Sequence, residues 1–245
     1  MSHPPHTTLS IVIPAFNERR RLGRTLEQIR RFAETHTNVR EILVVDDGST
    51  DGTAERVREL TAGSPPARVL INRVNRGKGY SVRRGVLAAE ADAVLVTDAD
   101  LSTPIEEIAK LLACLARGDD VAIGSRDAAA TTRTWPRRVM EWAFRTTRQR
   151  LLLADIHDTQ CGFKCFRREA AREIFSRVTV DRFAFDCEVL VIARRLGFRI
   201  REVSVIWRAD PDSRLRPIRD SLAMLADLLR IRRRCRPTTT TPATG

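Results

Sequence analysis

The chain has 245 residues, of which 42% are hydrophobic and 30% charged, and its formal net charge at pH 7 is +12. This length suits one α/β domain with basic extensions, and no stretch approaches the roughly 20 apolar residues of a bilayer-spanning helix. The five cysteines are odd in number and lack a Cys-x-x-Cys spacing, which argues against a disulfide framework or a zinc knuckle.

Both ends of the chain are polar, and we expect disordered tails over residues 1–8 and 237–245. The first tail contains two prolines and no apolar signal-peptide core, which favours a cytoplasmic protein over an exported one. Between the tails we expect a globular domain over residues 9–212 and a basic amphipathic helix over residues 213–236.

Three apolar runs divide the first hundred residues into alternating strands and helices. The run 9–13 ends at Pro14 and is followed by apolar positions 22, 26, 29 and 32 at helical spacing. The run 41–45 leads into acidic and turn-forming residues, and the run 93–96 leads into a second acidic pair. This alternation predicts an α/β fold with an open, mostly parallel, Rossmann-like sheet. Ligands bind at the carboxyl ends of strands in such sheets, so we expect the polar clusters to share one edge.

Asp98 and Asp100 follow the third apolar run and are separated by a single alanine. Two carboxylates at the end of a strand offer hard oxygen ligands to Mg²⁺ or Mn²⁺. A solvated turn is the alternative on these residues alone, because an isolated Asp-x-Asp pair is common.

Lys78 is flanked by Gly77 and Gly79, in a segment that superficially resembles a dinucleotide loop. The third glycine of that loop is absent, since position 82 is valine. Small neighbours still allow backbone amides and the ammonium to approach one anion, as a nucleotide diphosphate would require. A plain surface turn is the alternative.

Arginines concentrate in the segments 133–150 and 214–236. In the second segment, apolar residues at helical spacing precede a basic cluster, which is typical of a helix at a membrane interface. A terminal helix that packs on the core and has a solvated basic end is the alternative. The basic segments have little aromatic interleaving, so we do not expect a nucleic acid as a partner.

Several motifs resemble the inverting glycosyltransferases of family two, which have a GT-A fold. They are, in chain order, Ile13-Pro14-Ala15-Phe16-Asn17-Glu18, Val45-Asp46-Asp47-Gly48-Ser49-Thr50-Asp51, Asn75-Arg76-Gly77-Lys78-Gly79, Asp98-Ala99-Asp100 and Gly124-Ser125-Arg126. Three later motifs resemble the branch of this family that loads a sugar onto a polyprenyl phosphate. Within that branch they resemble the dolichyl-phosphate glucosyltransferases more than the mannose synthases. These motifs are Asp158-Thr159-Gln160-Cys161-Gly162-Phe163-Lys164, Phe185-Asp186-Cys187-Glu188 and Ser213-Arg214-Leu215.

The resemblance implies a nucleotide-sugar donor and a divalent metal, Mg²⁺ or Mn²⁺. The residues it implies for the donor are Pro14, Ala15, Asn17, Glu18, Asp46 or Asp47, Lys78 and Asp98. Asp100 is expected to ligate the metal, with Asp98 beside it on the ribose or sugar side. Mannose synthases often carry a glutamine two residues after the second Asp, and Ser102 at that position disfavours mannose.

The acceptor that the resemblance implies is a polyprenyl phosphate, which is already ionised near neutral pH and therefore needs no general base. Its phosphate does need cations, and guanidinium groups suit it by bidentate hydrogen bonding. The expected acceptor-phosphate residues are Arg126, Arg137 or Arg138, Ser213 and Arg214, and we count these arginines with Asp98 and Asp100 as the catalytic set.

Two other reactions stay open beside the transfer of glucose from UDP-glucose. One is mannosyl transfer from GDP-mannose, and the other uses a hydroxyl acceptor with Asp186 or Glu188 as the base. A polyprenyl tail stays in the membrane, so we expect a peripheral enzyme at the cytoplasmic face. Its partner there is an anionic membrane surface or an integral-membrane protein.

Overall fold

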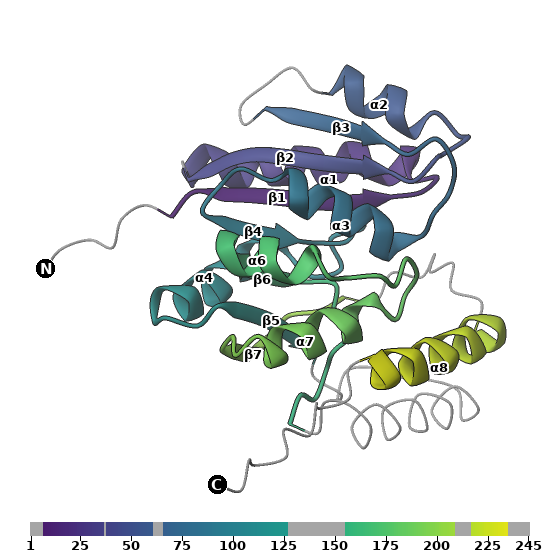
Figure 1. Cartoon of the computed structure of the whole chain (residues 1–245). Helices are drawn as coiled ribbons and strands as arrows, with labels where there is room; N and C mark the ends of the chain where they lie inside the picture. The colour runs from purple at the N-terminus through teal and green to yellow at the C-terminus, as the bar shows by residue number, and fades with distance from the viewer. Residues whose placement is uncertain (1–6, 37, 61–65, 127–154, 209–216, 235–245) are drawn as a thin grey trace, which may run out of the picture.

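The computed structural model describes residues 7–36, 38–60, 66–126, 155–208 and 217–234, with side chains from residue 226 onward in the last range. These residues form one seven-stranded sheet in the order β3-β2-β1-β4-β6-β5-β7 (Figure 1). The strands are β1 (Leu9–Ala15), β2 (Val39–Asp46), β3 (Ala67–Ile71), β4 (Ala93–Val96), β5 (Val121–Arg126), β6 (Lys164–Arg167) and β7 (Ile200–Val205).

The sheet is mostly parallel, as the alternation of strands and helices predicts. β1 pairs in parallel with β2 and β4, β2 with β3, and β5 with β7. Only β6, among the described strands, runs antiparallel to its neighbours β4 and β5. All residues of β1 and β4 are buried. Their near-continuous apolar sequences are what a sheet covered on both faces requires.

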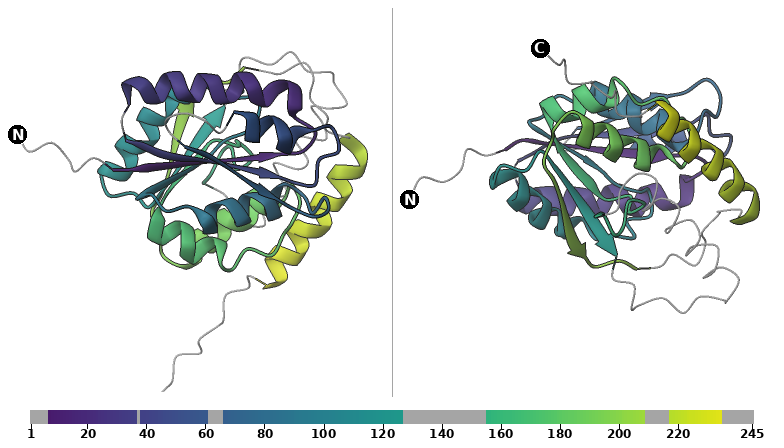
Figure 2. Two further views of the ribbon diagram at one scale, coloured as in Figure 1. Left: turned by 90° about the horizontal axis from the view of Figure 1, so that it is seen from above. Right: turned by 60° about the horizontal axis from the view of Figure 1, so that its bottom comes forward.

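Helices cover both faces of the sheet (Figure 2). One layer contains α1 (Arg19–Thr35), α2 (Thr53–Glu59), the 3₁₀ turn η1 (Ile105–Glu107) and α4 (Ile108–Ala116). The other contains α3 (Lys78–Ala88), α6 (Arg168–Phe175), α7 (Phe185–Arg195) and α8 (Pro217–Arg234). Each layer closes its own hydrophobic cluster against the sheet. The helix predicted after the first strand is α1, which buries Leu22, Leu26, Ile29 and Phe32.

Thr8, the last residue of the predicted N-terminal tail, is hydrogen-bonded to the segment that begins β4. Thr8 donates its backbone N–H and its hydroxyl to the Asp92 carboxylate, at 3.1 and 2.6 Å. Its carbonyl accepts from the Ala93 N–H at 2.9 Å. These bonds join the beginning of β1 to the beginning of β4.

α8 is the helix that the basic C-terminal segment predicts. Leu228 and Ile231 are 0% and 1% exposed and belong to the same hydrophobic cluster as the buried face of α7. Arg230, Arg232 and Arg233 are exposed. For residues 226–234 this matches the alternative of a terminal helix that packs on the core. None of the helices in the described ranges has the length and hydropathy needed to cross a membrane.

Candidate functional site

The loops after β1 and β2 meet at the carboxyl edge of the sheet, as expected for neighbouring parallel strands. The Asn17 N–H donates to Ser49 Oγ at 2.8 Å, and Asn17 Oδ1 accepts from the Thr50 N–H at 2.9 Å. The Glu18 N–H donates to Thr53 Oγ1 at 2.9 Å. Asn17 has a φ of +57°, in the left-handed region that asparagine tolerates better than most residues. Asn17 and Glu18 therefore belong to one hydrogen-bonded edge with the 49–53 loop.

Asp46 and Asp47, at the end of β2, are 1% and 3% exposed. Burial raises the pKa of Asp46, although Ser49 donates to its carboxylate. The Asp47 carboxylate accepts from Asn72 Nδ2 at 2.8 Å, from the Arg76 N–H at 2.9 Å and from the Gly77 N–H at 2.7 Å. Asp47 thus shapes the loop that leads to Lys78, while its contact with a base or ribose stays a prediction.

The two glycines around Lys78 are required by a close approach of another backbone segment. Gly77 has a φ of +113°, and a Cβ at this position would lie 2.4 Å from the Asp181 carbonyl oxygen. A Cβ on Gly79 would lie 2.4 Å from the Val180 carbonyl oxygen. Side chains at either position would push the 180–182 segment away from the start of α3.

Lys78 and Asp98 form an ion pair, with 2.5 Å between Nζ and Oδ1. Burial would lower the pKa of Lys78, but Asp98, followed by Asp186 and Asp100, raises it above its ordinary value. Burial would raise the pKa of Asp98, yet Lys78 lowers it. Both groups are therefore charged at neutral pH. The pair holds the Lys78 ammonium at the edge of the sheet where β1 and β4 end.

Asp100 is exposed, and its Oδ1 accepts the Ser102 N–H at 2.9 Å. The next residue, Leu101, has a φ of +46°, which is uncommon for a bulky side chain and marks a constrained loop. Its N–H donates to the Asp98 carbonyl oxygen at 3.2 Å. The loop therefore presents one ion-paired and one accessible carboxylate.

These carboxylates fit a hard divalent cation. The described part of the chain has no group of three or more His, Cys, Asp or Glu side chains placed to hold a metal. Mg²⁺ commonly takes only one or two protein carboxylates and completes its octahedron with waters and substrate phosphates. Asp100 is the better ligand of the two because Asp98 is already engaged by Lys78.

Arg126, at the end of β5, is brought to the same edge and is clamped by Asp158. Its Nε and Nη2 donate to the two Asp158 oxygens at 2.6 and 2.9 Å, and its guanidinium lies 5.5 Å from the centre of the Trp207 ring. Burial would raise the pKa of Asp158, but Arg126 lowers it. A contact of Arg126 with the acceptor phosphate stays a prediction. Arg137, Arg138, Ser213 and Arg214 lie outside the described residues.

Asp186 and Glu188, the two candidate bases, are buried in internal contacts. Asp186 pairs with Lys164 at 2.5 Å, and both side chains are less than a tenth exposed. Glu188 accepts the N–H and hydroxyl of Thr179, each at 2.8 Å, and the Val180 N–H at 2.7 Å. These contacts give both carboxylates a structural role in holding the segments around the site.

Two residues shape the Asp98–Asp100 loop: Gly162, which the sequence analysis named only as part of a motif, and Thr25, which it missed. A Cβ on Gly162 would lie 2.1 Å from Asp98 Oδ2, so this position must be glycine for Asp98 to keep its place. Thr25 in α1 donates its hydroxyl to the Ala99 carbonyl oxygen at 2.6 Å. Its signal in the sequence is a polar residue in the middle of the apolar face formed by positions 22, 26 and 29.

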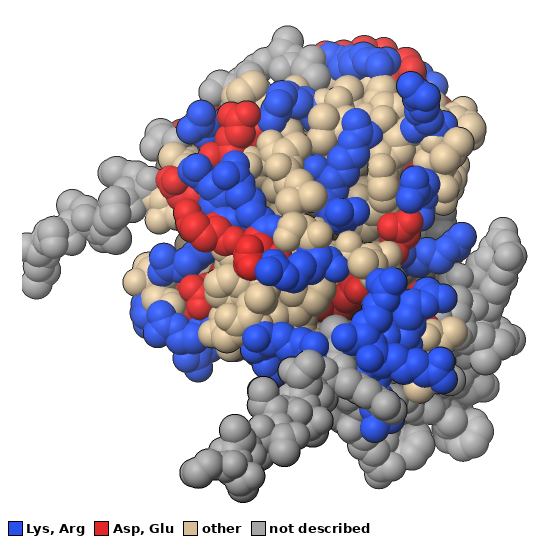
Figure 3. All heavy atoms as spheres, viewed as in Figure 1, with Lys and Arg blue, Asp and Glu red and all other residues tan. Residues whose placement is uncertain are grey.

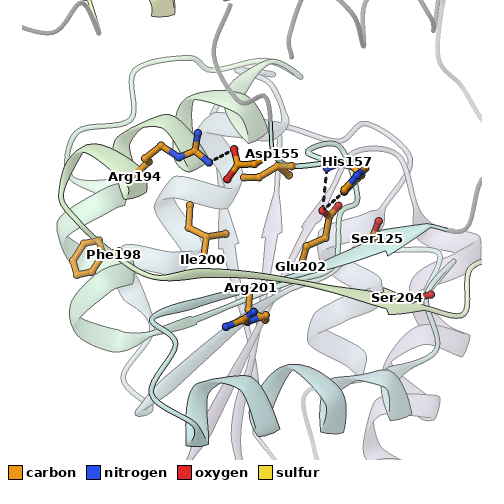
Figure 4. A pocket seen from close by; sticks show the side chains of 10 residues that line it. Ser125, Asp155, His157, Arg194, Phe198, Ile200, Arg201, Glu202 and Ser204 are labelled. Atoms are coloured by element: carbon orange, nitrogen blue, oxygen red, sulfur yellow. Dashed lines mark hydrogen bonds and ion pairs between the residues drawn. The ribbon is translucent and has the colours of Figure 1, made fainter. Parts of the chain in front are cut away.

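A cavity of about 560 Å³ lies beside β5 and β7 and contains none of the carboxylates of the acidic loop (Figure 4). Four of its charged or titratable groups form two pairs, Arg194 with Asp155 and His157 with Glu202, whereas Arg201 pairs with Asp119 outside the cavity lining. Glu202 also accepts the Asp158 N–H at 2.7 Å. Glu202 in the cavity wall therefore helps to hold Asp158, which in turn holds Arg126.

Comparisons with known proteins agree with this arrangement. Residues 10–175 match the family model "Glycosyl transferase family 2". The chain is 35% identical over 240 residues to a dolichyl-phosphate beta-glucosyltransferase of Dictyostelium discoideum, covering 91% of this chain and 73% of the relative. It is 34% identical over 247 residues to that of Homo sapiens, covering 94% and 76%.

Solved structures show the same fold. Glucosyl-3-phosphoglycerate synthase from Mycobacterium tuberculosis, crystallised with Mn²⁺, UDP-glucose and phosphoglyceric acid, superimposes with a TM-score of 0.72 at 24% identity, covering 92% of this chain and 80% of that one. Mannosyl-3-phosphoglycerate synthase from Rubrobacter xylanophilus gives a TM-score of 0.69 at 19% identity, covering 98% and 79%. At these identities the similarity concerns the fold alone.

Proposed function

The chain belongs to glycosyl transferase family 2, and from this premise we propose that it transfers glucose from UDP-glucose, with inversion, to the phosphate of a polyprenyl or dolichyl phosphate. The observation that carries the proposal is the similarity over more than nine-tenths of the chain to relatives named dolichyl-phosphate beta-glucosyltransferase. The product is a sugar linked to a lipid through one phosphate.

On the donor side, the chain supplies an accessible carboxylate and a fixed ammonium. Asp100 would hold the divalent metal, Mg²⁺ or Mn²⁺, which when bound neutralises charge on the departing diphosphate. Lys78, held by Asp98, adds a positive charge beside the same group. Because charge on the leaving phosphate grows as the sugar departs, this cation stabilises the transition state more than the ground state. The loops after β1 and β2 form the nucleotide side of the site with Pro14, Ala15, Asn17, Glu18, Asp46 and Asp47.

On the acceptor side, a phosphate oxygen of the lipid forms the new bond to the sugar as the bond to UDP breaks. No proton has to be removed from this oxygen, since the phosphate is already ionised near neutral pH. The burial of Asp186 and Glu188 in internal contacts supports a phosphate acceptor over a hydroxyl one. The acceptor phosphate would be held by Arg126 and by residues outside the described ranges, namely Arg137, Arg138, Ser213 and Arg214.

The lipid acceptor requires the enzyme to work at a membrane surface, and α8 supports an electrostatic contact. Figure 3 shows lysine and arginine side chains gathered over the region where Figure 1 places α8. Arg230, Arg232 and Arg233 are exposed there, and Arg182 is exposed on the neighbouring segment. The cytoplasmic leaflet is anionic, and each basic residue near it contributes about 1 kcal/mol. We infer peripheral binding at this face; an integral-membrane partner is the alternative.

A transfer assay with purified protein tests which nucleotide sugar is the donor. The protein would be incubated with undecaprenyl or dolichyl phosphate, with Mn²⁺ or Mg²⁺, and with radiolabelled UDP-glucose or GDP-mannose in parallel. We expect label from UDP-glucose in the organic-extractable lipid, and loss of that label when the metal is chelated. Label only from GDP-mannose would replace the glucosyl assignment with the mannosyl alternative.

A further inference from the structure

Thr25 is a polar residue in the middle of the buried face of α1. It is 3% exposed and lies between Leu22 and Leu26, which are 0% and 1% exposed. A buried hydroxyl costs free energy unless it is hydrogen-bonded, so its partner shows what the hydroxyl does. Threonine in a helix commonly bonds to the carbonyl three or four residues earlier in the same helix. Thr25 instead donates to the carbonyl oxygen of Ala99, 74 residues away in sequence.

Ala99 is the residue between the two carboxylates of the acidic loop, and it is 7% exposed. The peptide group that joins Ala99 to Asp100 is planar, so fixing the Ala99 carbonyl also fixes the direction in which the chain enters Asp100. The hydrogen bond is 2.6 Å long and buried. A hydroxyl on α1 therefore holds the peptide group that leads into Asp100, without touching the Asp100 carboxylate.

The Asp100 side chain has a contact within its own loop, because its Oδ1 accepts the Ser102 N–H at 2.9 Å, while the bond from Thr25 holds the peptide group that precedes Asp100. The side chain of Asp98 is held by its ion pair with Lys78 and by the closely packed backbone of Gly162. The far end of the loop is held where the Ser102 carbonyl accepts the Arg208 N–H at 2.8 Å. Between these points Leu101 adopts its uncommon positive φ. A strained conformation persists only where the surroundings hold it in place.

We propose that Thr25 is a positioning residue, which holds Asp100 in the orientation that receives the divalent metal of the donor complex. The inference rests on the proposed function for the role of Asp100. Outer groups that orient a metal ligand typically affect metal affinity by about 10- to 100-fold when they are removed. Thr25 acts in the same way, through the backbone of the ligand loop.

The test compares T25V, which keeps the shape but removes the hydroxyl, with T25S, which keeps the hydroxyl. Mn²⁺ binding in the presence of UDP would be measured by calorimetry and by the electron paramagnetic resonance signal of free Mn²⁺, with UDP binding in chelator as a second readout. We expect T25V to weaken Mn²⁺ binding about tenfold or more. T25S should stay close to wild type, and metal-free UDP binding should not change.

Thr35 offers a matched control in the same helix, because its hydroxyl donates to the Phe32 carbonyl within α1 and it is exposed. T35V should bind Mn²⁺ as the wild type does. If T25V does not fold, T25A, which also removes the hydroxyl, takes its place. Mn²⁺ binding by the hydroxyl-free variant equal to that of wild type would overturn the inference. So would a T25S defect as large as that of T25V.

This outcome is separable from that of the proposed function. Mn²⁺ and UDP report on the acidic loop without any acceptor, so a failed transfer to polyprenyl phosphate leaves the Thr25 comparison intact. Repeating the titration with GDP separates a wrong donor from a wrong role for Thr25. A dependence on the hydroxyl with either nucleotide supports the inference.

Discussion

Asp98 and Asp100 are one residue apart, yet the structure gives them different environments. Asp98 is ion-paired with Lys78 and packed against Gly162, whereas Asp100 is exposed and contacts the backbone of its own loop. A metal ligand must have oxygen lone pairs to offer, and Asp100 has more of them uncommitted. At the scale of single residues, these environments support the proposal that Asp100 holds the metal, while Asp98 fixes Lys78.

Replacement of Asp100 tests this division. We expect D100N to lower the glucosyl transfer rate by about 100-fold or more, since a metal supplies several kcal/mol of transition-state stabilisation. The thermal unfolding temperature should change little, because the side chain is exposed. Glu106 provides an acidic, exposed control on η1, and E106Q should keep full activity. Retained activity in D100N would show that another residue holds the metal.

Gly162 gives a second prediction at this scale. In G162A the new Cβ would meet Asp98 Oδ2 at 2.1 Å, so Asp98 has to move and its pair with Lys78 is disturbed. We expect lower transfer activity and a loss of about 1–3 kcal/mol in the free energy of unfolding. Urea denaturation measures the second quantity.

Gly23 is the matched control for Gly162. It lies within α1, where a Cβ would meet nothing closer than 3.6 Å. G23A should therefore raise stability by about 0.5–1 kcal/mol, because alanine is the better helix former. If G162A and G23A changed the free energy of unfolding equally, a steric clash between a Cβ at position 162 and Asp98 would be contradicted.

At the scale of elements, the sequence was sufficient where structure depends on local patterns. Leu22, Leu26 and Ile29 predict α1, and the apolar runs before Asp46 and Asp98 predict β2 and β4. The parallel order then places their polar ends at one edge. The contacts of Asp47 with Arg76 and Gly77, and the bond from Thr25 to Ala99, could not be predicted in this way. They join segments about 30 and 74 residues apart and depend on the exact approach of two backbones.

The start of β2 also carries a buried carboxylate that ties elements together. Glu41 is 6% exposed and accepts from Ser10 Oγ at 2.7 Å, the Glu90 N–H at 2.9 Å and Arg68 at 2.7 Å. Burial alone would raise the pKa of Glu41, but these hydrogen bonds and the Arg68 charge lower it below its ordinary value. The ionised form is therefore favoured in the folded state.

This gives a prediction for the pH dependence of stability. A carboxyl group whose pKa is lower in the folded state than in the unfolded state stabilises the protein at a pH above the unfolded pKa, which is about 4.3 for Glu. This stabilisation is lost as the pH falls through the pKa of the folded state. We expect E41Q to lose about 1–3 kcal/mol at pH 7 and to show a flatter decline in unfolding temperature below about pH 4.3. E27Q, at an exposed pair, is the control and should match wild type. If the unfolding temperature of E41Q declined below about pH 4.3 as steeply as that of wild type, the stabilising role of ionised Glu41 would be contradicted.

At the scale of the whole molecule, α8 places positive charge beside the segment that packs against the Lys78 loop. Leu228 and Ile231 pack against the core, whereas Leu229 is 42% exposed, and Arg230, Arg232 and Arg233 are exposed as well. The described half of the helix therefore offers positive charge and one exposed leucine to a membrane. An electrostatic contact of this kind weakens with salt. We expect such a contact to orient the enzyme on an anionic membrane surface.

Vesicle binding tests this orientation. We expect R232Q/R233Q to bind phosphatidylserine-containing vesicles about 30-fold more weakly than wild type, because two charges worth about 1 kcal/mol each are lost. Vesicles of phosphatidylcholine alone should bind neither protein. Arg20 and Arg24 are exposed on α1, in the opposite layer, and R20Q/R24Q should bind as wild type does. Equal binding by all three proteins would favour an integral-membrane partner.

Two acceptors with identical lipid tails distinguish a phosphate acceptor from a hydroxyl acceptor most directly. Radiolabelled UDP-glucose and Mn²⁺ would be supplied to the purified protein with a polyprenyl phosphate or with the corresponding polyprenol. We expect label in the polyprenyl phosphate alone, and substantial activity in any folded D186N or E188Q variant. Glucosylation of the polyprenol, with complete loss of that activity in a folded D186N or E188Q variant, would contradict this expectation and establish a hydroxyl acceptor.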